Sequence, residues 1–437
     1  MLTVVPLHSG RASYYVEDVA SGRAEGTGVQ GEPPGRWVAG AAAGLGLAGD
    51  VGHGALAHLL DGRRPDGAGD LGAADRRTVG GFDLTFAAPK SVSVLALLGP
   101  EAVAGAARAS HRAATDAALG YLADHALVAR RRSGGDLRLV TTTGWLAGAF
   151  DHHTSRALDP HLHTHVVAAN AVHGADGRWS GLDSRRLFAH HRAAGALYQA
   201  ELRAQLTGRL GVGWDDRGRG LADVAGVDPA LRGLFSQRSA EIRRYLTGVP
   251  GTSHRAAFYA TRPDKDRRHS VADLVPGWRE RAAAFGLDLD SLSRVPGPNA
   301  SASGRHPFDP GRVVEGLSQP RWSASGAAVA HVELVALVAA AHPVGAPVAT
   351  VVQRVSDLER EAGGATASGP AGSPRVGSAR GERFDVATLV GALGRGVGVD
   401  LGGPAPVPDP AGHRHRHDVP AAARQRGVDH RGLDLGR

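Results

Sequence analysis

The segment FDHHTSRALDPHLHTHVVAAN, residues 150–170, joins a β-rich run to a cluster of histidines. Its second half, within LHTHVVAANAV at 162–172, holds His163 and His165 on either side of a single residue. Successive side chains of a strand point to opposite faces, so these two imidazoles lie on the same face, close enough to share one ion.

A third histidine, His152, lies eleven residues before His163 and reaches the same ion if residues 153–161 turn back. The Asp159-Pro160 pair favours such a turn. Three neutral imidazoles leave positions open on a divalent ion, which is the layout of a catalytic metal site rather than a closed structural one. An ion held there can polarise a phosphoryl oxygen.

Chance is the alternative explanation for this spacing, because the chain contains 22 histidines. Four further histidines compete as ligands or lie on the surface, namely His153, His161, His190 and His191. A C-terminal run, HRHRH at 413–417, stands in low-complexity sequence without a scaffold, and we assign it no native function.

The strand signals continue upstream of this segment. GFDLTFA at 81–87 alternates apolar and polar side chains around aromatics, which is typical of a strand, and Pro89 ends it. The pattern between these strands predicts a helix over 101–125 and two extended runs, 126–132 and 137–150, around a turn at 133–136.

After Asp183 the apolar period becomes helical. Every fourth residue from Tyr198 to Leu210 is a large apolar or aromatic one, and Gly211 follows where a C-terminal cap belongs. Short helical pieces continue to about residue 290. Strands followed by helices fit an α+β domain.

Four segments follow from composition and periodicity. Residues 1–290 are predicted to form the principal domain, and 291–330 are rich in Pro, Ser and Gly and predict a linker. Residues 331–360 have a helical period broken by two prolines. Residues 361–437 carry little apolar material, so we expect a disordered tail.

Composition restricts the available chemistry. The chain has no cysteine, which excludes disulfides, thiolate metal sites and a cysteine nucleophile. Its net charge of +7 suits a polyanionic partner, although an arginine-rich coding bias explains it equally well. The start MLTVVPLHSG lacks a signal-peptide pattern, and no apolar run reaches the ~18 residues of a membrane span. We expect a cytoplasmic protein without membrane insertion.

Tyr14 and Tyr15 form the only adjacent tyrosine pair among six tyrosines. A phenol, with a pKa of about 10, is a weak nucleophile unless a base, metal or cation activates it. The alternative is two ordinary aromatics packed on a short helix. Asp83, inside an apolar strand, is the candidate carboxylate to orient a histidine or accept the phenol proton. The alternative for Asp83 is a position at a strand edge facing water.

Taken together, these features resemble the MobF (TrwC/TraI-type) conjugative relaxases of the HUH endonuclease superfamily. The resemblance covers about residues 1–285, and the order of the motifs and the gap from His152 to His163 both match the family pattern. The segments that carry it are SYYVEDVASG at 13–22, GRWVAGAAAGLGLAGDV at 35–51, GFDLTFAAPKSVSVLALLG at 81–99, the segment at 150–170, DGRWSGLD at 176–183, LYQAELRAQLTGRLGVGW at 197–214 and FSQRSAEIRRYL at 235–246.

The resemblance implies an antiparallel β-sheet palm flanked by helices, and it implies roles for particular residues. Lys90 in PKSVS and Arg156 in TSR are candidate phosphate contacts, and Tyr15 is a candidate second catalytic tyrosine. The remaining positions carried over are Tyr14 as nucleophile, Asp83 as the carboxylate that activates it, and His152, His163 and His165 as the metal ligands.

The implied activity is metal-dependent nicking and rejoining of single-stranded DNA at an origin of transfer, through a 5′-phosphotyrosine and without ATP. The implied ion is Mg²⁺ or Mn²⁺ in cells, although three imidazoles also hold Zn²⁺ or Ni²⁺ in vitro. Relaxosome accessory proteins and a type IV coupling protein are implied partners. Trp37, Trp145 and Trp179 are candidates for stacking on bases, or else core residues.

The sequence departs from the family pattern in two places. Many members carry a second tyrosine pair about eight residues after the first, where this chain has EGTG at 25–28. Relatives also continue into an ATP-driven helicase. The only two lysines, Lys90 and Lys265, are preceded by Pro89 and Asp264, so no GxxxxGK[ST] loop exists and we expect no nucleotide. The loss of likeness after about residue 360 suggests truncation or a shifted reading frame.

Three alternatives remain open at this stage. A relaxase remnant that only binds single-stranded DNA fits the missing tyrosine pair and helicase. A three-histidine metallohydrolase that uses bound water needs no tyrosine. A replication initiator or transposase of the same superfamily usually has its tyrosine after the histidines, whereas here the tyrosine pair precedes them.

Overall fold

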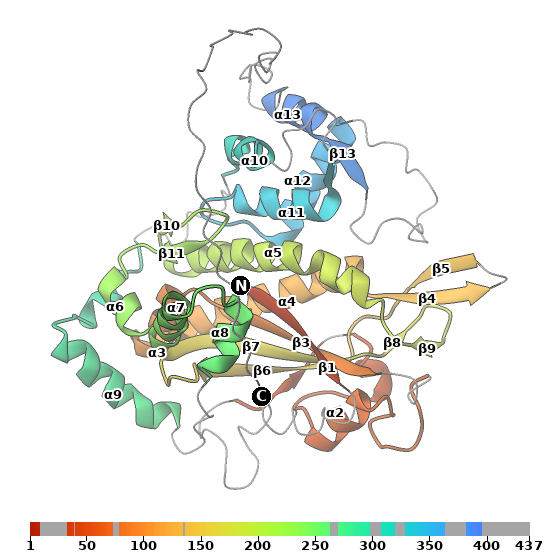
Figure 1. Ribbon diagram of the computed structural model, residues 1–437, viewed down its shortest axis with the longest axis horizontal. Helices are drawn as coiled ribbons and strands as arrows, with labels where there is room; N and C mark the ends of the chain where they lie inside the picture. Colours follow the sequence, from red (N-terminus) through yellow and green to blue (C-terminus); the bar gives the residue numbers. More distant parts are fainter. Residues whose placement is uncertain are drawn as a thin grey trace, which may run out of the picture. The chain divides into compact units, whose positions relative to one another are not determined.

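A five-stranded sheet lies at the centre of the computed structural model (Figure 1). Its strand order is β1-β3-β7-β6-β2, with antiparallel pairing throughout. The strands are β1 (Leu2–His8), β2 (Arg36–Trp37), β3 (Val79–Ala87), β6 (Ala147–Thr154) and β7 (Pro160–Ala169). The structure describes residues 1–8, 33–38, 40–72, 78–133, 136–262, 270–297, 307–319, 328–362 and 382–395. The predicted α+β class, an antiparallel sheet with helices beside it, is confirmed.

Helices cover the two faces of this sheet unequally. One face contributes Phe82, Leu84 and Phe86 of β3 to the larger core, which it shares with α3 (Lys90–Leu98), α4 (Glu101–His125) and α5 (Ser184–Leu210). On the other face, Val167 and Ala169 of β7 pack with α2 (His53–Leu60) in a smaller core. Because β7 alternates, His163 and His165 lie on the same face as the smaller core.

The long helices form where the apolar period predicts them. Helix α4 matches the predicted range of 101–125. Helix α5 begins after Asp183, whose side chain accepts a hydrogen bond from the Arg185 N–H. It ends at Gly211, which adopts a left-handed conformation with φ of 63° and donates its N–H to the carbonyl of Thr207. Both ends therefore show the expected capping chemistry.

The predicted extended runs are divided more finely than the sequence indicates. Strands β4 (Val128–Ser133) and β5 (Asp136–Thr141) pair antiparallel on either side of the predicted turn, with Ser133 opposite Asp136. The run 137–150, however, contains the end of β5 and the start of β6, since Gly144 has a φ of 100° that breaks the strand. The run 162–172 likewise divides between β7 and β8 (Val172–His173), which pairs with β9 (Trp179–Ser180).

Short elements follow α5, in agreement with the helical pieces predicted to about residue 290. Helices α7 (Gln237–Gly248) and α8 (His254–Ala260) pack against each other. The remaining small elements are η1 (Ala43–Leu45), β10 (Trp214–Asp216), β11 (Ala222–Val224), α6 (Pro229–Leu234), α9 (Val271–Ala284) and η3 (Asp290–Arg294).

Two segments that were expected to lack structure contain folded elements. Part of the expected linker forms α10 (Pro310–Leu317), and part of the expected tail forms β13 (Arg383–Asp385) and α13 (Val386–Arg395). The expectation is wrong for these residues because small groups of apolar side chains, such as Val313 and Leu317, are fully buried. The composition averaged over the whole segment does not reveal such small groups. The segment boundaries at 290, 330 and 360 stay a prediction.

Residues 331–360 form two helices, α11 (His331–Ala340) and α12 (Val348–Glu361), separated at the two prolines noted in the sequence. Together with β12 (Ala328–Ala330), these helices join the core of α5. Within the described residues, every helix is too short or too polar to span a lipid bilayer.

Candidate metal centre

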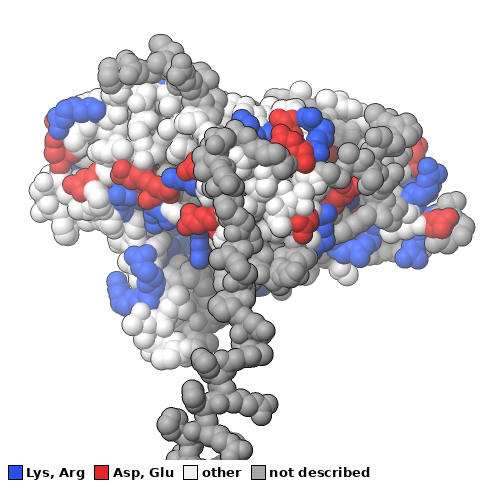
Figure 2. All heavy atoms as spheres, turned by 90° about the horizontal axis from the view of Figure 1, so that it is seen from above, with Lys and Arg blue, Asp and Glu red and all other residues white. Residues whose placement is uncertain are grey.

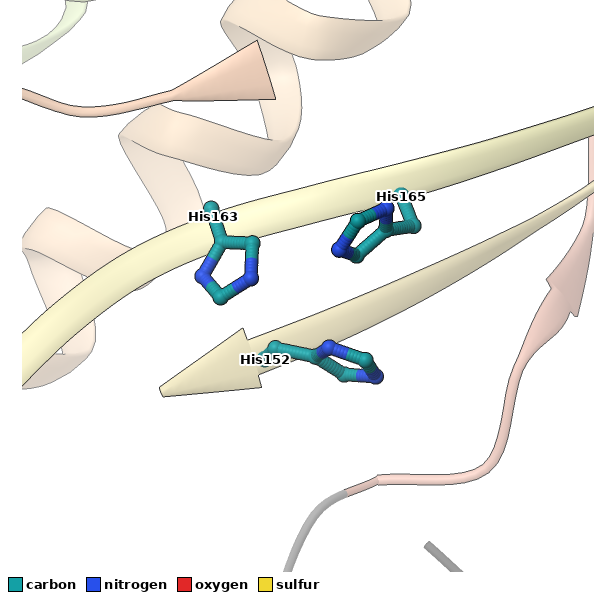
Figure 3. Close-up of side chains that lie close together, drawn as sticks. All are labelled: His152, His163 and His165. Atoms are coloured by element: carbon teal, nitrogen blue, oxygen red, sulfur yellow. The ribbon is translucent and has the colours of Figure 1, made fainter. Parts of the chain in front are cut away.

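Three histidine side chains converge on one point beside β6 and β7 (Figure 3). His152 of β6 is the register partner of His163 of β7, and His165 lies two residues further along the same strand. One ligand nitrogen from each imidazole lies within 4.8 Å of the other two. The predicted grouping of His152, His163 and His165 is therefore what the structure shows, with the turn between the strands where Asp159 and Pro160 indicate it.

Two of these imidazoles are held from behind. Nδ1 of His165 lies 3.0 and 2.9 Å from the carboxylate oxygens of Asp83, and the Thr85 hydroxyl is 3.2 Å from the same nitrogen. Nδ1 of His163 lies 2.9 Å from the carbonyl oxygen of His161. A carbonyl only accepts, so Nδ1 of His163 carries the proton and its Nε2 lone pair is available to an ion.

Burial keeps the central imidazole in the form that binds metal. The side chain of His163 is 8% exposed, and burial lowers its pKa well below the usual value, with the neighbouring imidazoles of His161, His165 and His152 acting in the same direction. A histidine binds a metal ion only when its imidazole is neutral. Three such donors and open coordination positions fit a divalent cation.

Asp83 lies in the sheet next to a histidine, as predicted for a carboxylate that orients one. It is 4% exposed, so the alternative of a strand-edge residue facing water is excluded. Residues Asp83 and Thr85 lie on the same face of β3, and Thr85 is the register partner of His165. The carboxylate thus orients the imidazole of His165. Its role toward the tyrosine stays a prediction, because Tyr14 and Tyr15 lie outside the described residues.

Lys90 and Arg156 lie at the end of the sheet that carries the histidines. The Lys90 ammonium donates to the carbonyl of Pro160 at 2.6 Å, at the start of β7. Burial lowers the pKa of Lys90 to about 8, partly opposed by Asp159. Arg156 lies half-buried in the turn between β6 and β7. Lys90 thus contacts the backbone of the strand that contains His163 and His165, and phosphate contact by either residue stays a prediction.

The competing histidines are placed elsewhere or play other parts. His153 lies on the opposite face of β6 from His152. His190 is buried, and its Nδ1 lies 2.9 Å from the Tyr121 hydroxyl. His191 lies on α5 with Nδ1 near the carbonyl of Phe188. His161 stacks on the ring of His163 at a centroid distance of 4.6 Å.

The three tryptophan side chains pack against the two hydrophobic cores. Trp145 is 3% exposed and donates its indole N–H to the carbonyl of Leu119. Trp37 and Trp179 pack against the smaller core. The core alternative therefore describes Trp145, whereas Trp37 and Trp179 are partly buried and their stacking on bases stays a prediction.

Sequence reasoning missed a second polar layer behind the histidine strand. On the opposite face of β7, the Thr164 hydroxyl lies 2.8 Å from Nε2 of His111, whose Nδ1 lies 2.7 Å from the Tyr198 hydroxyl. The Thr164 hydroxyl also donates to Asp151 at 2.5 Å. These residues come from four separate elements, so spacing along the chain carries no signal for them.

Comparison with known proteins agrees with this site. The TrwC relaxase family model matches residues 8–285. The multifunctional conjugation protein TraI of Escherichia coli is 37% identical over 273 residues, and that of strain K12 is 34% identical over 271. Each match covers 58% of this chain, which spans 15% of the length of these relatives.

Solved structures of a relaxase domain resemble the same part of the chain. The conjugative relaxase TrwC in complex with origin-of-transfer DNA, in its metal-bound form, matches with a TM-score of 0.58 and 29% identity over 66% of this chain and 100% of its own. TrwC complexed with a 27-mer DNA that comprises the recognition hairpin and the cleavage site matches with a TM-score of 0.57 over the same shares. The family model spans well over half of the chain, and the chain therefore belongs to the TrwC relaxase family.

Proposed function

We propose that this protein is a conjugative DNA relaxase that nicks and rejoins single-stranded DNA at an origin of transfer. The observation that carries the proposal is the three-histidine centre backed by Asp83, within a domain of the TrwC family. The solved relatives are complexes of TrwC with origin-of-transfer DNA, and two of them are metal-bound structures.

The proposed reaction is a transesterification at phosphorus. A divalent ion held by His152, His163 and His165 supplies Lewis-acid polarisation of a non-bridging phosphate oxygen. The phenol oxygen of Tyr14 forms a bond to phosphorus while the bond to the 3′ oxygen breaks, and the phenol proton ends on that oxygen. The products are a 5′-phosphotyrosine and a free 3′-hydroxyl. One ester replaces another, so the step is reversible and needs no ATP.

Asp83 performs two tasks in this proposal. Its carboxylate accepts the Nδ1 proton of His165, which fixes the tautomer that leaves Nε2 free for the ion. It also supplies negative charge that helps to draw the proton from the Tyr14 phenol, directly or through a histidine. Both tasks need the same buried position on β3.

The proposed ion in cells is Mg²⁺ or Mn²⁺. Three imidazoles bind Zn²⁺, Ni²⁺ and Cu²⁺ more tightly, so the ion present in purified protein reflects supply as well as affinity. The proposed setting is the cytoplasm, with relaxosome accessory proteins and a coupling protein as partners of the complete transfer reaction.

A basic and aromatic surface on α7 and α8 supports single-stranded DNA as the substrate. On the face drawn in Figure 2, basic and acidic side chains are interspersed, so net charge alone does not locate the substrate. Residues 237–262, in contrast, hold five arginines and one glutamate, an excess of four positive charges. Phe258 and Tyr259 are 38% and 52% exposed there. Cations beside exposed rings are what a flexible single strand binds.

One incubation separates this function from its alternatives. Purified protein, Mn²⁺ and a labelled single-stranded oligonucleotide spanning the origin of transfer of the element that carries the gene are mixed, then resolved under denaturing conditions. A relaxase leaves label attached to protein, and Tyr14→Phe abolishes that adduct. A metallohydrolase releases free product and tolerates Tyr14→Phe, whereas a remnant binds the oligonucleotide without cutting it.

A further inference from the structure

The turn between β6 and β7 is held by three helices at three consecutive residues. This turn, residues 155–159, connects the strand of His152 to the strand of His163. Leu158, Asp159 and Pro160 each receive a hydrogen bond from a different set of side chains. We call these contacts the turn clamp; its donors are Lys90 of α3, Gln237 of α7, and Trp278 and Arg281 of α9.

Asp159 lies at the centre of the turn clamp. Its side chain is 1% exposed and accepts from Arg281 Nη2 at 2.7 Å, from the Gln237 N–H at 2.8 Å and from Gln237 Nε2 at 3.0 Å. The Arg281 guanidinium also lies over the ring of Phe235, 4.6 Å from its centroid. The carboxylate thus ties the turn to two helices at once.

The residues on either side of Asp159 are held separately. The indole N–H of Trp278 donates to the carbonyl of Leu158 at 2.7 Å. Leu158 has a φ of 54°, a left-handed conformation that costs a non-glycine residue free energy and persists only where the surroundings impose it. Lys90 holds the carbonyl of Pro160 at 2.6 Å.

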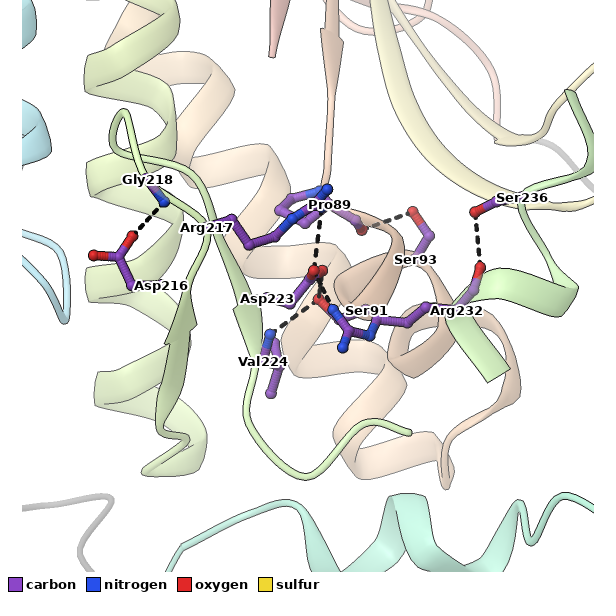
Figure 4. Close-up of polar contacts among 10 residues, drawn as sticks. All are labelled: Pro89, Ser91, Ser93, Asp216, Arg217, Gly218, Asp223, Val224, Arg232 and Ser236. Atoms are coloured by element: carbon purple, nitrogen blue, oxygen red, sulfur yellow. Dashed lines mark hydrogen bonds and ion pairs between the residues drawn. The ribbon is translucent and has the colours of Figure 1, made fainter. Parts of the chain in front are cut away.

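Helix α3, which carries Lys90, is itself fixed by a buried ion cluster (Figure 4). The Asp223 carboxylate, 1% exposed, accepts from the Ser91 hydroxyl at 2.8 Å and pairs with Arg217 and Arg232. Ser93, two residues further along, accepts the backbone N–H of Leu162 through its hydroxyl. The start of β7 is therefore fastened to a rigid support.

The sheet alone does not fix the end of this hairpin. The pairing of β6 with β7 shifts register between His152 and Thr154, so the ladder is irregular next to the first metal ligand. Replacing a buried ion pair by apolar residues of similar volume is often neutral or stabilising, so stability alone does not account for this pair.

We propose that the turn clamp sets the spacing of His152 and His163, with Asp159 as its positioning residue, and thereby tunes metal affinity; this inference rests on the metal centre of the proposed function. Asp159 touches neither the ion nor DNA in this account. It acts by holding the chain four residues before His163, immediately ahead of β7, so that three nitrogens meet at one point without reorganisation.

The test is a Co²⁺ titration of the full chain, followed by calorimetry and by the visible absorption of the bound ion, at a temperature well below unfolding. Asp159→Asn and Arg281→Met are expected to weaken Co²⁺ binding about 10-fold and to change the absorption bands, as outer contacts of metal ligands do. Arg281→Lys keeps a donor and is expected to recover most of the affinity. Asp288→Asn is the matched control, because Asp288 pairs with Arg294 on the surface.

Each outcome decides a different claim. If the unmodified chain fails to bind Co²⁺, the metal centre and the proposed function fail together. If it binds, and Asp159→Asn binds equally well, the turn clamp alone is refuted. Should Asp159→Asn not fold, Trp278→Phe removes the N–H donor and keeps a smaller aromatic ring; weaker binding supports the clamp, and unchanged binding overturns it.

Discussion

Nδ1 of His165 on β7 lies 2.9 Å from Oδ2 of Asp83 on the neighbouring strand β3. The pair is diagonal across the two strands, since the direct register partner of His165 is Thr85. A carboxylate that holds the far nitrogen of a ligating histidine fixes the ring and raises its basicity.

Asp83→Asn is expected to weaken divalent metal binding by about 10- to 100-fold, because the amide keeps the shape but loses the charge that orients His165. Calorimetric titration with Mn²⁺ measures this loss. Asp215→Asn, at an exposed position on β10, is the control and should bind as the unmodified protein does. Equal affinities for the two variants would remove Asp83 from the metal centre.

His163→Ala and His161→Ala are expected to differ sharply, although the two rings stack. His163 supplies a ligand nitrogen, so its loss should cost on the order of 100-fold in metal affinity. His161 contributes its backbone carbonyl, which alanine retains, so His161→Ala should bind nearly as well as the parent. Inductively coupled plasma analysis after dialysis, with calorimetry, distinguishes them. A greater loss in His161→Ala would mean that the ligand set is misassigned.

Acid is expected to destabilise the fold through His111. Burial lowers the pKa of His111 to about 4, partly opposed by Asp151, against a usual value of 6.5. As the pH falls from 6.5 to 4, His111 takes up a proton in the unfolded chain but not in the folded chain. The free energy of unfolding therefore decreases as the pH falls through that window. The loss is roughly 2 kcal/mol between pH 7 and pH 5. Urea unfolding at both values measures it.

The matched comparison for this prediction is His111→Asn. This variant has no imidazole to titrate, so the difference in its free energy of unfolding between pH 7 and pH 5 should be smaller than in the parent. An identical difference in both proteins would assign the acid sensitivity to other groups. The variant is expected to be less stable at pH 7, because the Tyr198 and Thr164 hydroxyls lose their partners.

Gly345→Ala is expected to loosen the C-terminal helices from α5. Gly345 has a φ of +84°, and a Cβ there would press on the backbone of Ala200 and Ala204. The neighbouring Ala346 N–H donates to the carbonyl of Ala200 at 3.2 Å, so the chain cannot retreat without losing that bond. A loss of about 2 kcal/mol or more in unfolding free energy should follow.

Gly218→Ala controls for the backbone conformation alone. Gly218 has a similar φ of +77°, but a Cβ there meets open space. Its substitution should cost about 1 kcal/mol. Equal losses in both variants would mean that α11 and α12 are not seated tightly on α5.

The histidine centre could be predicted because its information is local. Alternation along one strand places His163 beside His165, and a short turn returns His152 to them. Helix α5 could be predicted equally well, because its apolar period and the residues at its two ends can be recognised from neighbouring positions in the sequence. Asp83 needed the additional knowledge of which strand pairs with which, and the family pattern supplied it.

The turn clamp and the His111 layer could not be predicted in this way. Asp159 meets Gln237 and Arg281, which are 78 and 122 residues away along the chain. No periodicity records such contacts, and the Asp-Pro pair indicates only a turn. The folded elements near residues 313 and 384 could not be predicted from composition. A few buried apolar side chains are enough to fold them when they pack on a core that α5 already forms.

The most direct test of the central claim is a crystal structure of the Mn²⁺-loaded protein with a single-stranded oligonucleotide from the origin of transfer, using anomalous scattering to locate the ion. We predict one peak about 2 Å from a nitrogen of each of His152, His163 and His165, with the Tyr14 phenol oxygen facing the phosphate beside it. An ion bound elsewhere, or a Tyr14 side chain on a distant surface, would contradict the account.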